Sequence, residues 1–472
     1  MHAEPLRAAD ARREAAARAA RLGRPILLSV TRPLDPLEAT AARARAARGA
    51  EVRWQRPSAA EGFFAHGAAH VIESAAAQPA GAIAAGWRDL LAAAVVDDPA
   101  AEPWSGPLAL GGFAFDPLRP PTSLWTGFPA ARFVVPARLL IQRGEQTWLT
   151  TNELIGPPPP THLPISGGLA STVQRSPKPP GRTSRAATIP SPGCAAPALA
   201  PLAATAWQAL VAKTARGIAD GTLGLDKVVL ARAERLHAER PFDPAAALER
   251  LVQAYPTCTV FAVRSGEATF LGATPERLVD VRDGVASTMA LAATIRRGAT
   301  PDEDTHLAQA LLASAKERTE HAIVAAALRQ TFDDVCTRVV ADAEPRIERL
   351  PNLQHLLTSI RGQLAPGRTV LDVVARLHPT PAVGGAPRGP ALDLLRRCES
   401  LDRGWYAGAL GWLNRAGDGE FIVGIRSALV HGTEATLFAG CGIVADSDPA
   451  AEYAESNWKL RPMLAALGAS PV

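Results

Sequence analysis

Alternating and periodic apolar positions predict a chain built mainly of strands with a few helices. Short apolar runs between turn residues are typical of strands, and Asp283-Gly284 between two such runs is a good hairpin turn. The expected strands cover residues 25–30, 51–54, 111–116, 131–143, 147–152, 228–231, 259–263, 268–273, 278–282, 285–295, 405–413, 420–430 and 435–439. Apolar residues at helical spacing predict helices over 6–22, 207–221, 303–331 and 449–467. Strand runs separated by single helices indicate antiparallel sheets with helices outside them, an α+β fold.

One segment departs from this pattern. Residues 157–201 are rich in Pro, Ser and Thr, with prolines gathered at 157–160 and 177–180. Such a composition buries too little apolar surface to offset the entropy of ordering, so we interpret 157–201 as a flexible connector. It separates an N-terminal part, 1–156, from a C-terminal region, 202–472.

Composition narrows the class of protein. Hydrophobic residues make up 47% and charged residues 20%, which is typical of a soluble globular protein. The net charge is only +4 and no basic run accompanies it, so no nucleic-acid partner is expected. No apolar stretch reaches the length of a membrane span and the N-terminus lacks a signal-type core, which predicts a cytoplasmic protein. Five scattered cysteines without a CxxC pair indicate neither a zinc site nor a disulfide framework.

Two glutamate pairs are candidate metal ligands. Glu317 and Glu320 lie three residues apart in a predicted helix, and Glu452 and Glu455 repeat the spacing in the last helix, with Lys459 one turn further on. Like charges at this spacing are mildly unfavourable unless they are solvated or neutralised. A hard cation such as Mg²⁺ would neutralise them, and two solvated acidic helix faces are the alternative.

Three further charged residues could do chemistry. Lys227 begins an apolar strand, where it either extends its charge to the surface or acts as a base with a lowered pKa. Glu276 follows the corner Gly272–Pro275 and is either an ordinary turn residue or a general acid in a cleft. Arg426 is predicted inside a strand, where it needs either a protein carboxylate or a substrate carboxylate as partner.

Two loops are also unusual. Residues 378–385, HPTPAVGG, form a rigid loop too specific in shape to be generic coil. Gly440 and Gly442 lie at the end of a predicted strand, where they either serve a turn or let the backbone approach a ligand.

Taken in order, these segments resemble the chorismate-utilising enzymes: the isochorismate, salicylate, anthranilate and aminodeoxychorismate synthases. The resemblance covers about residues 207–467 and rests on LDKVVLAR, FLGATPERLV, KERTEHAIV, LQHLLTSIRG, HPTPAVGG, DRGWYAGALGW, FIVGIRSALV, AGCGIVADSDP and EYAESNWKL. GGFAFDP and RFVVP in the N-terminal part look like the long-form isochorismate synthases of menaquinone and siderophore synthesis. The resemblance implies a layered α/β/β/α fold to which residues 1–156 contribute strands, with residues 202–472 as the chorismate-binding catalytic region.

The resemblance also implies roles for individual residues. Glu320 and Glu455 match the family's Mg²⁺ ligands, with Glu317 and Glu452 as direct or water-mediated partners. Lys227 would activate water for attack on C2 of chorismate, and Glu276 would protonate the departing C4 hydroxyl. The substrate-binding residues would be His355, Ala382, Tyr406, Arg426, Gly440, Gly442, Lys459 and Thr294.

The same comparison of motifs favours one branch of the family. In anthranilate synthases, which use ammonia, the position that matches Lys227 resembles a glutamine, so the lysine here favours water as the nucleophile. No glutaminase subunit is therefore expected, and the protein would be a monomer or homodimer. We therefore predict an isochorismate synthase, an isomerase acting on the small molecule chorismate, with a salicylate synthase or an inactive chorismate-binding homologue as alternatives. One departure stands out: Ala293 occupies a position where the family usually has glycine. If that position needs a positive φ or touches substrate, its methyl group would strain the site.

Overall fold

The computed structural model describes residues 8–156, 204–350 and 353–469, so the predicted connector 157–201 lies outside the described residues. The described helices are α1 (Ala8–Leu22), α2 (Pro36–Gly49), α3 (Pro79–Leu91), α4 (Ala204–Ala219), α5 (Pro244–Ala254), α6 (Pro301–Ala313), α7 (Ala315–Val335), α8 (Val370–Leu377), α9 (Arg388–Cys398) and α10 (Pro449–Leu467). The strands of the N-terminal part are β1 (Ile26–Pro33), β2 (Val52–Arg56), β3 (Glu61–Ser74), β4 (Val95–Asp97), β5 (Ala109–Phe113), β6 (Ala131–Arg143) and β7 (Gln146–Ile155). The strands after the connector are β8 (Lys227–His237), β9 (Thr259–Ser265), β10 (Ala268–Thr274), β11 (Arg277–Arg282), β12 (Val285–Arg296), β13 (Cys336–Ala341), β14 (Arg346–Arg349), β15 (Leu353–Leu364), β16 (Gly385–Ala386), β17 (Ala409–Leu413), β18 (Gly419–Val423), β19 (Ser427–His431) and β20 (Glu434–Ile443).

The strands form two runs that diverge from β6. One run passes through β3, β2, β9, β10, β19, β20 and β8, and every neighbouring pair in it is antiparallel. The other passes through β5, β17, β18, β11, β12 and β15, again antiparallel throughout. Both runs therefore contain strands from each half of the chain.

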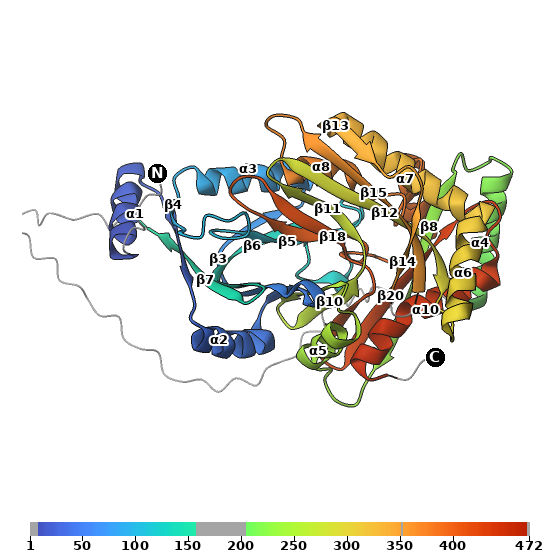
Figure 1. Ribbon diagram of the computed structural model, residues 1–472, viewed down its shortest axis with the longest axis horizontal. Helices are drawn as coiled ribbons and strands as arrows, with labels where there is room; N and C mark the ends of the chain where they lie inside the picture. The colour runs from blue at the N-terminus through green and yellow to red at the C-terminus, as the bar shows by residue number, and fades with distance from the viewer. Residues whose placement is uncertain (1–7, 157–203, 351–352, 470–472) are drawn as a thin grey trace, which may run out of the picture.

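Helices cover the outer faces of the two runs. α10 packs on β20 and α5 on β10, whereas α7 packs on β12 and α8 on β11 (Figure 1). The result is the predicted α+β arrangement of helix, sheet, sheet and helix, which confirms the expected fold class. None of the helices in the described part of the chain is long and apolar enough to cross a membrane.

The chain crosses between the runs at two adjacent points. β10 leads into β11 of the other run through Pro275 and Glu276, and β18 returns to β19 through residues 424–426. The crossings hold each other: the Val423 N–H donates to the Glu276 carbonyl at 3.0 Å, and the Ala273 N–H donates to the Arg426 carbonyl at 3.2 Å. These two corners set the position of the site described below.

Two predicted elements are interrupted in the structure. The expected helix 303–331 is two helices, because Ser314 takes an extended conformation (φ −69°, ψ 116°) and its hydroxyl caps α7 by accepting from the Glu317 N–H. The expected strand 420–430 is β18 and β19. The prediction that Arg426 lies inside a strand is therefore wrong. Arg426 lies in the crossing between β18 and β19, with φ +52°.

Aromatic packing joins the N-terminal part to the rest of the core. Trp125 is 1% exposed, and its ring lies 5.3 Å from that of Phe270 and 5.6 Å from that of Phe438. Its indole N–H donates to the Asp402 carbonyl at 2.9 Å. Both parts of the chain therefore share one hydrophobic core.

We predict that Trp125→Ala destabilises the whole protein. Removing a buried aromatic side chain typically lowers the free energy of unfolding by about 3–5 kcal/mol, because it leaves a cavity as well as losing apolar burial. Urea unfolding followed by circular dichroism measures the loss. Leu37→Ala is the control, since Leu37 is 85% exposed. A separate early transition of the N-terminal part, with the rest unchanged, would contradict the shared core.

Candidate active site

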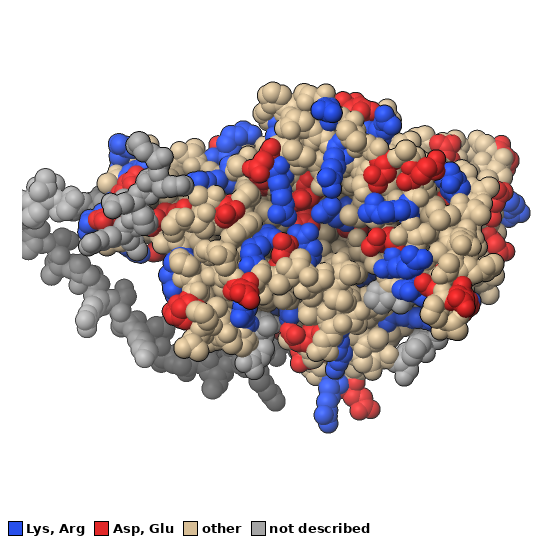
Figure 2. Space-filling view, in the orientation of Figure 1, with Lys and Arg blue, Asp and Glu red and all other residues tan. Residues whose placement is uncertain are grey.

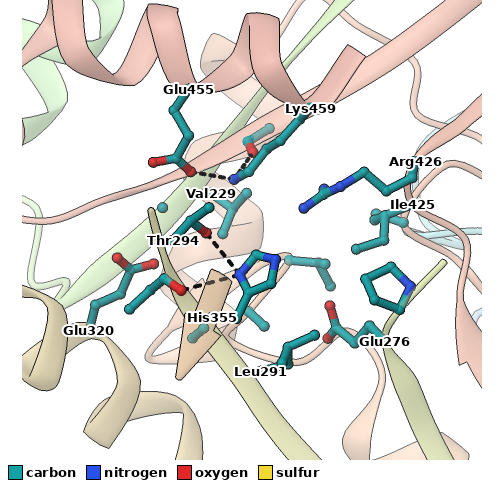
Figure 3. Close-up of a pocket in the computed structure, with 18 of the residues that line it drawn as sticks. Val229, Glu276, Leu291, Thr294, Glu320, His355, Ile425, Arg426, Glu455 and Lys459 are labelled. Carbon is teal, nitrogen blue, oxygen red and sulfur yellow. Dashed lines mark hydrogen bonds and ion pairs between the residues drawn. The ribbon is translucent and has the colours of Figure 1, made fainter. Parts of the chain in front are cut away.

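An enclosed cavity lies between the two sheet runs, beside α7 and α10. We call it the active-site cavity. All of the predicted site residues except Glu317 and Glu452 line it (Figure 3). Those that line it are Lys227, Glu276, Thr294, Glu320, His355, Ala382, Tyr406, Arg426, Gly440, Gly442, Glu455 and Lys459. The fold thus brings together residues that lie up to 232 positions apart in the sequence (227 to 459).

Glu276 and Arg426 enter the cavity from the two sheet crossings. Glu276 is 6% exposed, and burial raises the pKa of its carboxyl group to about 7, although Arg426 and Lys227 oppose the shift. Figure 3 shows both side chains on the same side of the cavity. A carboxyl group with this pKa can hold a proton near neutral pH and give it up, as a general acid must.

Lys227 faces the metal-ligand candidates from β8. Its side chain is 1% exposed, and its ammonium group lies 2.7 Å from a carboxylate oxygen of Glu320 on α7. Burial alone would raise the pKa of Glu320, but the charge of Lys227 lowers it below its usual value. The contact depends on Gly442, because a Cβ there would lie 2.4 Å from the Glu320 carboxylate and 2.6 Å from the Lys227 side chain.

A second ion pair lies on α10. The Lys459 ammonium is 2.5 Å from the Glu455 carboxylate and donates to the Gly440 carbonyl at 2.9 Å. Burial opposes the charge of Lys459, but Glu455 raises its pKa above the usual value. Lys459 therefore stays positively charged beside the cavity.

Glu317 and Glu452 stand behind this first set of carboxylates. Lys316 joins them, at 3.2 Å from Glu452 and 3.9 Å from Glu317. Burial and the charge of Glu320 raise the pKa of Glu317 to about 7, and burial and the charge of Glu455 raise that of Glu452. Four carboxylates that disfavour one another's charge, all oxygen donors, fit a hard divalent cation.

His355 is held by a bulge in the neighbouring strand. The β12–β15 register shifts between Ala292 and Thr294, and Ala293 in the bulge has φ +63°. His355 Nδ1 lies 3.1 Å from the Thr294 hydroxyl and 3.2 Å from the Ala293 carbonyl, and burial lowers the His355 pKa to about 3. Its Nε2 is buried and has no partner among the described residues, so a neutral imidazole nitrogen is free for a ligand.

Other residues complete the lining. Tyr406 stacks on Phe438 with ring centroids 5.0 Å apart, and burial raises its pKa to about 12, so its phenol stays protonated. Arg403, which we did not predict, also lines the cavity. It pairs with the buried Glu399 at 2.7 Å and donates to the Val229 and Val383 carbonyls. Arg403 belongs to the DRGWYAGALGW motif, and this was the one feature of the sequence that could have identified it as a cavity residue.

The free space in the cavity is small. It measures about 60 Å³, compared with about 300 Å³ or more for typical ligand pockets. Lys227 and Lys459 lie against the glutamates that would hold a cation. A substrate and a cation would therefore enter by displacing these side chains from their present pairs.

Backbone strain gathers at this cavity. Ala293, Ala407 and Arg426 all have positive φ, at +63°, +58° and +52°, and all three line it. Left-handed conformations at non-glycine residues cost about 1–3 kcal/mol each and are found preferentially at functional sites. Position 293 therefore meets the condition under which we expected its methyl group to strain the site.

Fold and site together define a protein with antiparallel sheets and outer helices, in which Lys227, Glu276 and two glutamates from α7 and α10 line one cavity. The sequence profile described as chorismate binding enzyme matches residues 13–468, and the chain belongs to this family. It is 38% identical over 454 residues to the salicylate biosynthesis isochorismate synthase of Pseudomonas aeruginosa, covering 95% of this chain and 91% of that protein. It is 36% identical to the isochorismate synthase MenF of Bacillus subtilis, over 77% of this chain and 75% of that one.

Solved structures agree. The menaquinone-specific isochorismate synthase MenF of Escherichia coli superposes with a TM-score of 0.72 at 25% identity, covering 94% of this chain and 95% of that one. The putative 2,3-dihydroxybenzoate-specific isochorismate synthase DhbC of Bacillus anthracis superposes with a TM-score of 0.69 at 25% identity, covering 90% of this chain and 97% of that one. The arrangement of layers described above is therefore that of the family.

We predict that Ala293→Gly stabilises the protein by about 1 kcal/mol, because glycine adopts positive φ without the steric cost that alanine bears. The midpoint of thermal unfolding should rise. Ala290→Gly is the matched control, because Ala290 lies in the regular part of the same strand and the change should lower the midpoint. A fall for both variants would show that the bulge does not strain Ala293.

Proposed function

We infer that this chain is an isochorismate synthase, which isomerises chorismate by adding water at C2 and losing the C4 hydroxyl. The observation that carries the proposal is the presence of Lys227 and Glu276 in one enclosed cavity with a carboxylate cluster between α7 and α10. The relatives named above, all isochorismate synthases by name, support the same reaction.

Cationic and amide groups would bind the two carboxylates of chorismate. Arg426 can grip the enolpyruvyl carboxylate with its planar fork, next to the Tyr406 phenol. Lys459 and the backbone at Gly440 and Gly442 face the ring carboxylate. These contacts hold the ring at a fixed position between Lys227 and Glu276, which is the main contribution of positioning to the rate.

Mg²⁺ is the cation we propose for the carboxylate cluster. Glu320 and Glu455 would hold it, with Glu317 and Glu452 as direct or water-mediated partners, and it would supply positive charge to balance the ring carboxylate. Lys227 accepts a proton from the attacking water. Glu276 donates its proton to the departing C4 hydroxyl, which leaves as water, so that substrate and product have the same composition.

The identity of the base also limits the nucleophile. A lysine at position 227 serves water, which needs a proton removed, so we propose no glutaminase partner for this chain. We further propose a cytoplasmic enzyme that works as a monomer or homodimer on a small-molecule substrate.

Product analysis tests the proposal. Purified protein with chorismate and Mg²⁺ should give isochorismate by chromatography, and EDTA should abolish the product because the carboxylate cluster then lacks its cation. Salicylate and pyruvate as products would assign the chain to the salicylate synthases instead. Binding of chorismate without turnover would make it an inactive homologue, and an aminated product in an ammonium-supplemented sample would overturn the role of Lys227.

Glu276→Gln should lower kcat by about 100-fold or more while chorismate still binds, because the amide keeps the size of the side chain but has no proton to donate. Rates with the variant and a calorimetric titration with chorismate give the two quantities. Loss of binding with an intact fold would show that Glu276 serves the structure or the binding step rather than proton transfer.

The pH profile should follow the same group. Glu276 donates a proton only below its pKa of about 7, so kcat/KM should fall as the pH rises through 7. Glu317 has a similar pKa, so Glu317→Gln is the control: its remaining activity should keep the descending limb. A limb that disappears in Glu317→Gln would assign the ionisation to the carboxylate cluster.

A further inference from the structure

A second cavity lies between α3 and α8, and we call it the α3–α8 cavity. It measures about 1070 Å³, at the upper end of the range for small-molecule sites, and shares no lining residue with the active-site cavity. α3 and α8 pack against each other along one edge of the molecule (Figure 1). Its apolar wall consists of Trp87, Leu91, Phe113, Leu371, Val374 and Leu413. It could hold the apolar body of a ligand.

The charges around the α3–α8 cavity are unbalanced. Four arginines on its lining form no ion pair with any described residue: Arg88, Arg376, Arg388 and Arg415. The two carboxylates on the lining are already engaged, Asp116 with Arg396 at 2.7 Å and Asp372 with Arg368 at 3.1 Å. The lining therefore offers uncompensated positive charge, which favours an anionic group on the ligand. Charged side chains of both signs occur on the face of the molecule shown in Figure 2.

A buried histidine adds a polar group to the same lining. His378 is 8% exposed, and burial lowers its pKa to about 4, so it is neutral. Its Nε2 lies 3.3 Å from the Ala114 carbonyl, whereas its Nδ1 is buried without a partner among the described residues. Buried polar atoms are usually paired, so an unpaired one on a cavity lining points to a ligand.

One loop connects the two cavities. His378 and Pro379 line the α3–α8 cavity, while Ala382 and Val383 of the same loop line the active-site cavity. Arg388 donates from its two terminal nitrogens to the carbonyls of Arg376 and His378. At the other end, Arg403 in the active-site cavity donates to the Val383 carbonyl at 2.8 Å. An anion bound by Arg388 would thus act on the start of a loop whose end lies at the substrate.

We propose that the α3–α8 cavity is a second ligand site, for a small amphipathic carboxylate with an aromatic or alicyclic body, and that its occupancy alters chorismate binding through residues 378–383. The apolar wall takes the body of the ligand and the unpaired arginines take its carboxylate. The chemistry differs from that of the active-site cavity, where the carboxylate cluster requires a cation.

Binding is tested with a model ligand, biphenyl-4-carboxylate, and its neutral counterpart, biphenyl-4-methanol, by calorimetry without chorismate. We expect one carboxylate site per chain and at least about tenfold weaker binding of the alcohol, since a charge-assisted contact contributes enough to change affinity tenfold. The Arg88→Gln/Arg376→Gln double variant should lose binding to the same extent. Both side chains are exposed, so the variant should fold normally.

Two control variants locate the probe. Arg240→Gln removes an exposed arginine before α5 and should leave binding within about twofold. Arg426→Gln changes the active-site cavity and should also leave the binding of biphenyl-4-carboxylate unchanged. Loss of binding in Arg426→Gln but not in the double variant would place the probe in the active-site cavity and overturn the proposal. Gel filtration gives the oligomeric state of the protein that binds biphenyl-4-carboxylate. If only the monomer binds it and a dimer does not, the α3–α8 cavity is covered by a second copy of the chain, which would overturn the proposal.

The coupling is tested separately and rests on the proposed function. Saturating biphenyl-4-carboxylate should change the KM for chorismate by about fivefold or more, the lower end of typical couplings between sites. The double variant should show no such change. Binding with an unchanged KM would overturn the coupling and leave the ligand site standing, whereas absence of any turnover would contradict the proposed function alone.

Discussion

Charge neutralisation inside a buried cavity is the constraint on which this site depends. Lys227 on β8 pairs with Glu320 on α7, and Lys459 pairs with Glu455 one turn away on α10. Both pairs form because an isolated charge at such depth would be strongly destabilising. The pairs also bring the proposed base next to the proposed metal ligands. The glutamates that we propose for the cation are therefore the partners that now balance the two lysines.

The two sheet crossings solve a related problem of placement. A corner between two sheets lies beside the space that both sheets enclose, so a side chain there can enter the cavity while the backbone keeps its hydrogen bonds. Glu276 and Arg426 occupy such corners, and the corners hydrogen-bond to each other. Their separation is thus fixed by backbone contacts, which suits a pair that must act on one small molecule.

Much of this could be predicted from the sequence, and the exceptions have physical causes. Local patterns located most strands, and the motifs in their order identified charged cavity residues from β8, the sheet crossings, α7 and α10. The break at Ser314 escaped prediction because the helical periodicity continues across it, although the cap from Ser314 to Glu317 is local. The left-handed Arg426 depends on its contact with the other crossing, which no local pattern reports. The α3–α8 cavity joins helices nearly 300 positions apart, and no local pattern reports such neighbours.

The pairing of N-terminal strands with strands that follow the connector has a consequence for how the protein folds during synthesis. β5 pairs with β17 and β2 with β9, so N-terminal strands remain without their partners until much of the chain has left the ribosome. Pairings this distant in sequence form slowly and leave sheet edges open in the meantime. The helix α10, with Glu455 and Lys459, is the last described element to emerge. A nascent chain therefore acquires its charge-balanced cavity only after α10 has emerged, and its unpaired sheet edges are open to aggregation until their partners follow.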